Sequence, residues 1–185
     1  MKIYCLGDSL TAGYGVAPHK NWVSLLGSRG KNLWINGGIS GDTSPGLLAR
    51  LQTAAIPQKP DMVIWMGGFN DILLTGSADL AKACVMAFVN HCAAAGIRPV
   101  IGIPFLLQSV AEPWCRLCDW KTCRPVLEDY VLWLRRFCEA ARLRCVDFRE
   151  AGAHLLPDGM HPTEEGHRVM AEAVIRCPCF REVSL

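Results

Sequence analysis

The sequence predicts an α/β fold in which five mainly parallel strands alternate with helices. Short runs of β-branched and apolar residues alternate with longer stretches in which apolar residues recur at helical spacing. This alternation is typical of βα units, which build a largely parallel sheet. With 185 residues and 51% hydrophobic content, the chain is long enough for one sizeable core but short for two. We therefore expect a single domain over residues 1–185.

Five short apolar runs are the expected strands. They cover Ile3 to Leu6, Leu33 to Asn36, Met62 to Met66, Val100 to Ile103 and Cys145 to Phe148. Helical spacing begins near Asn21, Pro45, Ala78, Pro125 and Thr163. The last helix has the clearest start, because Thr163 is a suitable N-cap and two glutamates follow it in the first turn. The segment from Phe105 to Arg124 lacks a regular pattern, and we expect a lid-like loop or a short helical insertion there.

Charge and hydropathy argue against nucleic-acid and membrane functions. The net charge is only +2 and the basic residues are scattered, whereas binding to a phosphate backbone requires a concentrated positive face. No apolar stretch approaches the roughly 20 residues that span a bilayer. The first residues, MKIYCLGDS, lack the apolar run of a secretory signal. We expect a soluble, cytoplasmic protein that acts on a small molecule, without nucleic acid as a partner and without stable membrane insertion.

Ten cysteines are many for this length, and without a secretory signal we expect them to stay reduced. Five lie in apolar periodic segments, where a free cysteine behaves as a small core residue: Cys5, Cys84, Cys92, Cys138 and Cys145. Cys115, Cys118 and Cys123 form a separate group, the first two at the C-x2-C spacing of zinc sites. A fourth ligand is not evident unless the CPC sequence at 177–179 folds close to them. Loop thiols or an occasional disulfide are therefore the alternative to zinc.

Small and polar residues follow four of the five expected strands. The sequence reads GDS after the first strand, NGGISGDTS after the second, MGGFND after the third and DGMH beyond the fifth. In an open parallel sheet the functional groups collect beyond the carboxyl ends of the strands. We therefore expect these four sequences to meet at one edge of the sheet.

Ser9 lies where the first strand turns into a helix, and we expect its hydroxyl to face outward. A serine hydroxyl is a poor nucleophile unless a base removes its proton, and His161 is the expected base. Asp158 precedes His161 by three residues in the same loop. Its carboxylate can accept the Nδ1 proton, fix the tautomer and leave Nε2 facing the serine. Ser9, Asp158 and His161 thus form a candidate catalytic triad.

The other four histidines are the alternatives to His161. None of them stands three residues after an acidic residue in a loop. His91 and His167 lie in expected helices, where a partly exposed histidine needs no function. His154 lies close to the same loop as His161, so position alone does not exclude it.

Acyl transfer also needs hydrogen-bond donors for the oxygen that becomes negative in the tetrahedral intermediate. Three donors are available: the backbone N–H of Ser9, the backbone N–H of Gly41 and the side-chain amide of Asn70. At Gly41 the missing side chain permits close approach. For Asp8 and Asp71 we expect supporting roles in the turn, loop or following helix.

Apolar walls around a few polar groups are how ligand sites are built, and five residues are candidates for the substrate pocket. They are Leu10, Phe69, Phe105, Trp114 and Met160. Packing in the core is the alternative for the large aromatic residues.

Four sequence blocks resemble the SGNH, or GDSL-type, hydrolase superfamily, and most of all the small bacterial acyl-CoA thioesterase I / lysophospholipase / arylesterase group. The blocks are GDSLTAGYG at Gly7 to Gly15, NGGISGDTSPGLLARL at Asn36 to Leu51, GGFND at Gly67 to Asp71 and DGMHP at Asp158 to Pro162. They occur in the family's order and span nearly the whole chain. The resemblance implies a three-layer α/β/α sandwich, the flavodoxin-like SGNH fold, without a metal or organic cofactor.

The same resemblance implies the roles of the site residues. Ser9 would be the nucleophile, Ser9, Gly41 and Asn70 the oxyanion hole, and Asp158 and His161 the rest of the triad. Two features depart from the family pattern. Phe69 stands where close relatives often carry a small residue, and the Cys- and Trp-rich stretch from Pro113 to Arg124 is unlike the corresponding loop of the thioesterase group. Both bear on the substrate more than on the reaction.

The expected function is hydrolysis of esters or thioesters of small or short-chain acyl groups through an acyl-serine intermediate. One alternative is a deacetylase of acetylated sugars or other metabolites that uses the same triad. An alternative outside the enzymes is a metal- or thiol-sensing module built on Cys115, Cys118 and Cys123.

Overall fold

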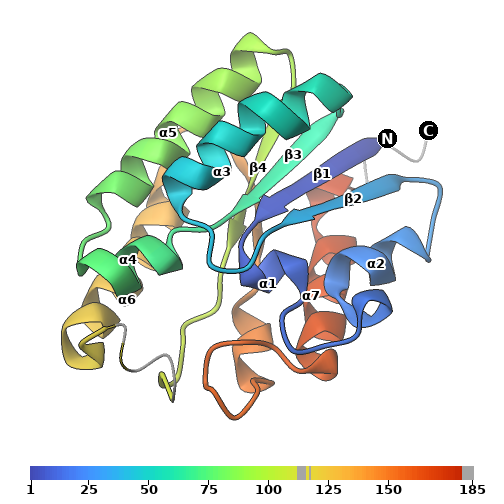
Figure 1. The fold of residues 1–185 in the computed structure, drawn as a ribbon. Coiled ribbons are helices and arrows are strands. Elements are labelled where there is room, and N and C mark those ends of the chain that lie inside the picture. Colours follow the sequence, from blue (N-terminus) through green and yellow to red (C-terminus); the bar gives the residue numbers. More distant parts are fainter. Residues whose placement is uncertain (112–115, 117, 181–185) are drawn as a thin grey trace.

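The computed structural model describes residues 1–111, 116 and 118–180, and within them five strands form one sheet in the order β2-β1-β3-β4-β5 (Figure 1). The strands are β1 Lys2–Gly7, β2 Leu33–Gly38, β3 Met62–Met66, β4 Arg98–Ile103 and β5 Arg144–Asp147. All neighbouring strands are parallel. In the register of the sheet, Cys5 of β1 lies between Asn36 of β2 and Ile64 of β3. The predicted fold class and all five predicted strands are confirmed.

Burial along the strands follows from their places in the sheet. The strand β3, MVIWM, is buried at every residue, as expected for a central parallel strand with both faces covered. The edge strand β2 exposes Leu33 and Asn36. The largest fully buried side chains are Trp22, Trp65, Tyr130, Phe88, Phe105 and Phe148.

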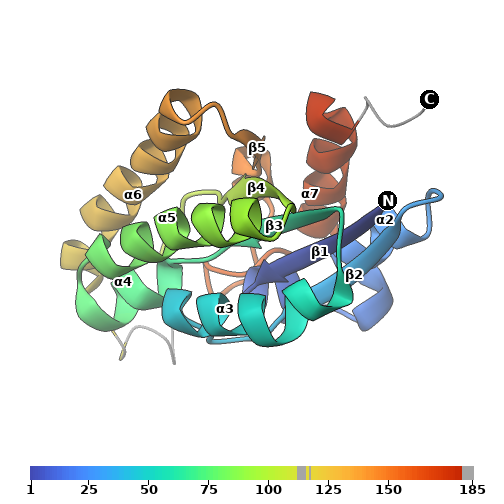
Figure 2. The same cartoon turned by 90° about the horizontal axis from the view of Figure 1, so that it is seen from above.

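Helices cover both faces of the sheet, which gives the three layers that the resemblance implied. The helices are α1 Ser9–Ala12, α2 Trp22–Gly27, α3 Ser44–Arg50, α4 Phe69–Thr75, α5 Asp79–Ala94, α6 Trp120–Ala140 and α7 Glu164–Arg176. Figure 2 shows α2 and α7 on one face and α3, α5 and α6 on the other. The connection from β1 to β2 moves toward one edge of the sheet, whereas the connections from β2 to β3, β3 to β4 and β4 to β5 move toward the other edge. Because crossovers between parallel strands are right-handed, α2 therefore lies on the opposite face from the helices of the later connections.

Short helical segments complete the chain. They are η1 Pro18–Lys20, η2 Leu51–Ala55, η3 Ile56–Gln58, η5 Arg149–Ala153 and η6 Pro178–Phe180. No helix in the described ranges is both long enough and apolar enough to cross a bilayer. The single domain over residues 1–185 and the cellular location stay predictions.

Two helices differ from the sequence-based expectation. The helix α6 begins at Trp120 and not near Pro125, because the Asp119 carboxylate accepts hydrogen bonds from Lys121 N at 3.1 Å and Thr122 Oγ1 at 2.7 Å and so caps an earlier turn. Pro125 therefore lies inside the helix, where it can donate no backbone hydrogen bond. The helix α4 was not among the expected helices, because no helical spacing of apolar residues was identified between Pro45 and Ala78.

The cysteines of the apolar segments lie in the core, except one. Cys5, Cys84, Cys92 and Cys138 are buried as predicted, whereas Cys145 is only half-buried. Cys118 and Cys123 share a side-chain hydrogen bond, and Cys115 falls outside the described residues. Among the described residues, no three His, Cys, Asp or Glu side chains are arranged to hold a metal ion. The three-cysteine zinc hypothesis is therefore neither supported nor tested.

Candidate active site

The loops that carry the predicted site meet at the carboxyl edge of the sheet. The strand β1 lies between β2 and β3, and the chain leaves β1 and β3 toward opposite faces. Such a switch point opens a crevice in α/β sheets. Ser9 follows β1, Gly41 follows β2 and Asn70 follows β3. The loop with Asp158 and His161 lies between β5 and α7.

Ser9 is held at the first turn of α1. The Asp8 carboxylate caps this helix by accepting a hydrogen bond from Leu10 N at 3.0 Å. At position 7, where β1 ends, only glycine fits, because a Cβ at Gly7 would lie 2.1 Å from Thr11 Oγ1 and 2.8 Å from the Met66 carbonyl oxygen. The strand thus runs straight into a tight helical turn, which presents the Ser9 side chain at the end of the sheet. This agrees with the supporting role expected for Asp8.

The structure brings the three residues of the predicted triad into hydrogen-bond contact. Ser9 Oγ lies 2.9 Å from His161 Nε2, and His161 Nδ1 lies 2.6 Å from Asp158 Oδ2. His161 is almost fully buried, and its ring packs against Tyr14 with a centroid separation of 4.4 Å. The contact spans 152 positions of sequence, so it depends on the packing of the whole sheet.

Asp158 is fixed as a carboxylate facing the imidazole. Its Oδ1 accepts hydrogen bonds from Met160 N at 2.9 Å and His161 N at 3.0 Å, while Oδ2 faces the ring. Burial alone would raise the pKa of Asp158, but the hydrogen bonds from the His161 backbone and ring and from Met160 hold it below its ordinary value. The charged form can therefore orient the His161 ring with Nδ1 protonated and Nε2 free to accept a proton.

Asn70 and Gly41 are placed beside Ser9 by a network between two loops. Asn70 Nδ2 donates to the Asp42 carbonyl at 2.8 Å, which leaves the second amide proton for another acceptor. Gly41 has a φ of +79°, so backbone conformation and not crowding favours glycine there. The Asp71 carboxylate accepts from Ser44 N at 2.9 Å and Ser44 Oγ at 3.0 Å and thereby holds the start of α3, as a supporting residue should.

Arg50 ties these loops to the strand ends, and sequence reasoning did not identify it. Its guanidinium donates to the Gly7 carbonyl at 3.0 Å and the Gly37 carbonyl at 2.5 Å, and it pairs with the Asp42 carboxylate at 2.5 Å. One side chain thus fixes the ends of β1 and β2 and the loop that Asn70 contacts. The available signal was a single basic residue in the otherwise apolar run LLARL.

Two hollows adjoin Ser9, and they differ greatly in size. The larger has a volume of about 300 Å³ and is lined by Ser9, Tyr14, Ser40, Gly41, Asn70, Met160 and His161. The smaller has a volume of about 10 Å³ and adds mainly apolar side chains, namely Leu10, Phe69, Leu73 and Leu107. Both include Ser9 and Asn70, so they adjoin the same candidate reactive centre.

The pocket candidates are placed unequally. Leu10, Phe69 and Met160 line the hollows. Phe105 is fully buried and is absent from the linings of both hollows, because it packs against Gly152 within the core. Trp114 lies outside the described residues. Sequence reasoning missed Tyr14, although it belongs to the same GDSLTAGYG block as Ser9.

The two histidines nearest to the triad in sequence differ in exposure. His154 is exposed, and its backbone carbonyl accepts a hydrogen bond from Thr163 N. His167 is fully buried, so its expected partial exposure was wrong. Its Nδ1 accepts from Trp22 N at 3.4 Å, and its buried Nε2 has no hydrogen-bond partner in the part of the chain described here. Burial, with a contribution from nearby His161, lowers the pKa of His167 from 6.5 to about 4.

His167 should make the fold sensitive to acid. Because its pKa is lower in the folded than in the unfolded chain, stability is retained above about pH 6.5 and falls as the pH drops toward 4. The full shift corresponds to about 3 kcal/mol of unfolding free energy. Between pH 7 and pH 4.5, we expect His167→Gln to lose about 2 kcal/mol less unfolding free energy than the wild type, as measured by urea unfolding at both pH values.

His91→Gln is the matched control for this prediction, because His91 on α5 is exposed in the folded chain. It should leave the pH dependence of stability unchanged. Equal pH profiles for the wild type and His167→Gln would contradict the assignment of the acid sensitivity to His167.

Sequence comparison finds relatives that are named as an arylesterase and a thioesterase. This chain is 44% identical over 75 residues to an arylesterase of Vibrio mimicus, and the aligned residues cover 38% of each chain. It is 33% identical over 98 residues to thioesterase 1/protease 1/lysophospholipase L1 of Escherichia coli K12, which covers 52% of this chain and 47% of that protein. The matches thus span less than half the length of these relatives.

Solved structures agree on the fold. A member of the lipolytic protein G-D-S-L family from Veillonella parvula superposes with a TM-score of 0.79 over 95% of this chain and 96% of that one, at 22% identity. The sequence model of the GDSL-like lipase/acylhydrolase family matches residues 5–169, which include all four blocks of the site. The chain therefore belongs to the GDSL-like lipase/acylhydrolase family.

Proposed function

We propose that this protein is a serine hydrolase that cleaves esters or thioesters of short acyl groups. The observation that carries the proposal is the continuous hydrogen-bonded series from Ser9 Oγ through the His161 ring to Asp158. Family membership and the arylesterase and thioesterase among its relatives support this reaction over a sugar deacetylase or a cysteine-based sensor.

In the acylation half of the proposed reaction, His161 removes the proton of Ser9 as Oγ attacks the acyl carbonyl. The contact of 2.9 Å between Oγ and Nε2 is within the range for direct proton transfer. Asp158 stabilises the resulting imidazolium and keeps its ring in place. The oxyanion is proposed to accept hydrogen bonds from the backbone amides of Ser9 and Gly41 and from the Asn70 side chain.

Collapse of the tetrahedral intermediate releases the alcohol or thiol, which takes the proton from His161. The acyl group then remains on Ser9 as an ester. In the second half, His161 removes a proton from water, which attacks the same carbonyl. Collapse of this second intermediate releases the carboxylic acid, and Ser9 Oγ takes the proton back from His161. The same hydrogen-bond donors stabilise the oxyanion of both tetrahedral intermediates, so one oxyanion hole is enough for the two halves of the reaction.

The unequal hollows support a preference for short acyl groups. We propose that the acyl chain enters the smaller one, where Leu10, Phe69 and Leu107 leave about 10 Å³, which is room for about one water molecule. The larger hollow, of about 300 Å³, would then receive the alcohol or thiol part beside Tyr14 and Ser40. Phe69 would set the chain-length limit, because its large side chain is buried in the wall next to Asn70.

Replacing Phe69 by alanine should shift the acyl preference toward longer chains. Removing the ring lengthens the smaller hollow, and each additional buried CH₂ group stabilises the bound substrate by about 0.8 kcal/mol. We expect the ratio of kcat/KM for hexanoyl over acetyl p-nitrophenyl ester to rise by about tenfold or more. Parallel assays with acyl-CoA thioesters and acetylated sugars identify the leaving group.

Leu74→Ala serves as the control, because Leu74 lies on the same helix but is exposed. It should leave the chain-length ratio unchanged. An unchanged ratio in Phe69→Ala would contradict the placement of the acyl chain in the smaller hollow. No turnover of any ester, thioester or sugar acetate by the wild type would contradict the proposed function itself.

A further inference from the structure

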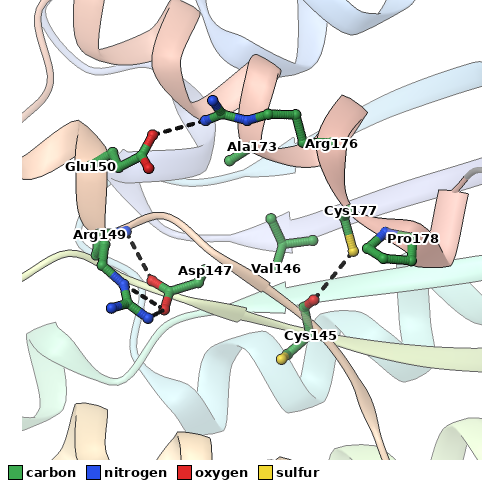
Figure 3. Close-up of a pocket in the computed structure, with 9 residues that line it drawn as sticks. All are labelled: Cys145, Val146, Asp147, Arg149, Glu150, Ala173, Arg176, Cys177 and Pro178. Atoms are coloured by element: carbon green, nitrogen blue, oxygen red, sulfur yellow. Dashed lines mark hydrogen bonds and ion pairs between the residues drawn. The ribbon is translucent and has the colours of Figure 1, made fainter.

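Four cysteines lie together at the far edge of the sheet, outside the candidate active site. Cys138 belongs to α6 and Cys145 to the edge strand β5, while Cys177 ends α7 and Cys179 lies in η6. The Sγ atoms of Cys177 and Cys179 are 2.7 Å apart in a thiol–thiol hydrogen bond. Cys177 Sγ also lies 3.3 Å from the Cys145 carbonyl oxygen (Figure 3). The proposed hydrolase reaction uses none of these thiols.

A hollow of about 420 Å³ gives access to this corner. Cys145 and Cys177 line it, together with four charged residues at its border: Asp147, Arg149, Glu150 and Arg176. These charges are paired, Arg149 with Asp147 at 2.6 Å and Arg176 with Glu150 at 2.8 Å (Figure 3). Because the lining holds two acidic and two basic side chains, the hollow suits a small neutral molecule better than an anion. Asp147 also pairs with Arg135, which is not among the lining residues, at 3.2 Å.

The two thiols of the CPC sequence are not equivalent. Cys177 is half-buried and lines the hollow, whereas Cys179 is buried and is not among the lining residues. Two main causes raise the pKa of the Cys179 thiol: the hydrogen bond with Cys177, which is the larger one, and burial. Cys179 therefore keeps its proton, so the accessible Cys177 is the thiol that a small molecule in the hollow reaches first.

We propose that Cys177 and Cys179 form a redox-active dithiol that a hydroperoxide converts reversibly to a disulfide. The accessible Cys177 thiol, which donates to the Cys145 carbonyl at rest, gives up its proton, and the resulting thiolate attacks one peroxide oxygen, so that the O–O bond breaks. With hydrogen peroxide, this gives a sulfenic acid on Cys177 and hydroxide, which leaves as water after taking up the Cys177 proton. Cys179 then attacks the sulfenic sulfur, the S–S bond forms, and a second water leaves with the Cys179 proton. Two thiols lose two electrons and two protons, and one peroxide becomes two waters.

The modification should be local. Oxidation removes the thiol hydrogen of Cys177 and with it the hydrogen bond to the Cys145 carbonyl, which joins the end of α7 to β5. His161 lies before the opposite end of α7, a helix of 13 residues and thus about 20 Å long. Ester turnover should therefore be the same in the reduced and oxidised forms, whatever the substrate of the protein is.

Peptide mapping of the full chain tests this proposal. Reduced protein is treated with about one equivalent of hydrogen peroxide, alkylated with iodoacetamide and digested with trypsin. Cleavage after Arg176 and Arg181 places both thiols in one peptide, CPCFR. We expect this peptide to lose two carbamidomethyl groups and to weigh 2 Da less than the reduced, unalkylated form; dithiothreitol should restore alkylation.

Variants separate the roles of the two sulfur atoms. In Cys179→Ser, the resolving thiol of the proposal is missing, so the sulfenic acid at Cys177 should last long enough to be trapped by dimedone. Cys92→Ser is the matched control, because Cys92 is fully buried on α5 and should leave disulfide formation unchanged. Complete alkylation of CPCFR after peroxide treatment would overturn the proposal. So would a first disulfide at Cys138–Cys145 or Cys118–Cys123, the two further thiol pairs that share a hydrogen bond among the described residues.

Discussion

Ser9→Ala should abolish ester turnover and leave the fold intact. The variant removes the only atom proposed to bond to the acyl carbon, while His161, Asp158 and the amide donors remain in place. Loss of a nucleophile of this kind lowers kcat by about 10⁴-fold or more, because the remaining donors can only stabilise attack by water. Initial rates with p-nitrophenyl acetate, together with thermal unfolding of the same preparation, measure both parts of the prediction.

The control for this prediction is Ser40→Ala. Ser40 lines the same hollow but is exposed, and the hydroxyl that contacts His161 is that of Ser9. Its replacement should change turnover by less than about tenfold, the scale of one modest contact. A Ser9→Ala enzyme with turnover within tenfold of the wild type would remove Ser9 from the mechanism.

Asn70→Ala should lower kcat by about 10²- to 10³-fold with little change in KM, since its amide is proposed to stabilise charge that appears only in the transition state. The variant also loses the hydrogen bond from Asn70 Nδ2 to the Asp42 carbonyl. One hydrogen bond contributes about 1 kcal/mol to stability, whereas the expected loss of rate corresponds to about 2.7–4 kcal/mol. The loss of the structural bond alone is therefore too small to explain the expected effect.

Steady-state kinetics and urea unfolding on the same Asn70→Ala preparation distinguish these contributions. We expect a large fall in kcat beside a loss of about 1 kcal/mol in unfolding free energy. If kcat stays within threefold of the wild type, Asn70 serves only to anchor the Gly41–Asp42 loop.

Local patterns were enough to predict the sheet and the approach of the triad residues. Each strand is a short apolar run, and parallel strands bring the residues that follow them to one edge, so the blocks around Ser9, Gly41 and Asn70 had to converge. The loop with Asp158 and His161 carries its own geometry, because the aspartate accepts from backbone amides two and three residues later.

Features that depend on distant packing were not predictable. The burial of His167 results from its contact with Trp22, 145 positions away, and the role of Arg50 depends on carbonyls at the ends of two strands. The start of α6 was missed because the helical spacing of apolar residues begins near Pro125, after the first turn that Asp119 caps. Phe105 comes just after the carboxyl end of β4, where pocket residues are expected, but it is fully buried and packs against Gly152.

Trapping of the acyl-enzyme tests the central claim most directly, namely that acyl groups pass through Ser9. Wild-type protein is mixed with p-nitrophenyl acetate, quenched in acid within one turnover and digested for mass spectrometry. We predict a gain of one acetyl group, confined to the peptide that contains Ser9 and absent when Ser9→Ala is treated in the same way. An acetyl group on another residue during turnover, or equal labelling of Ser9→Ala, would contradict the account.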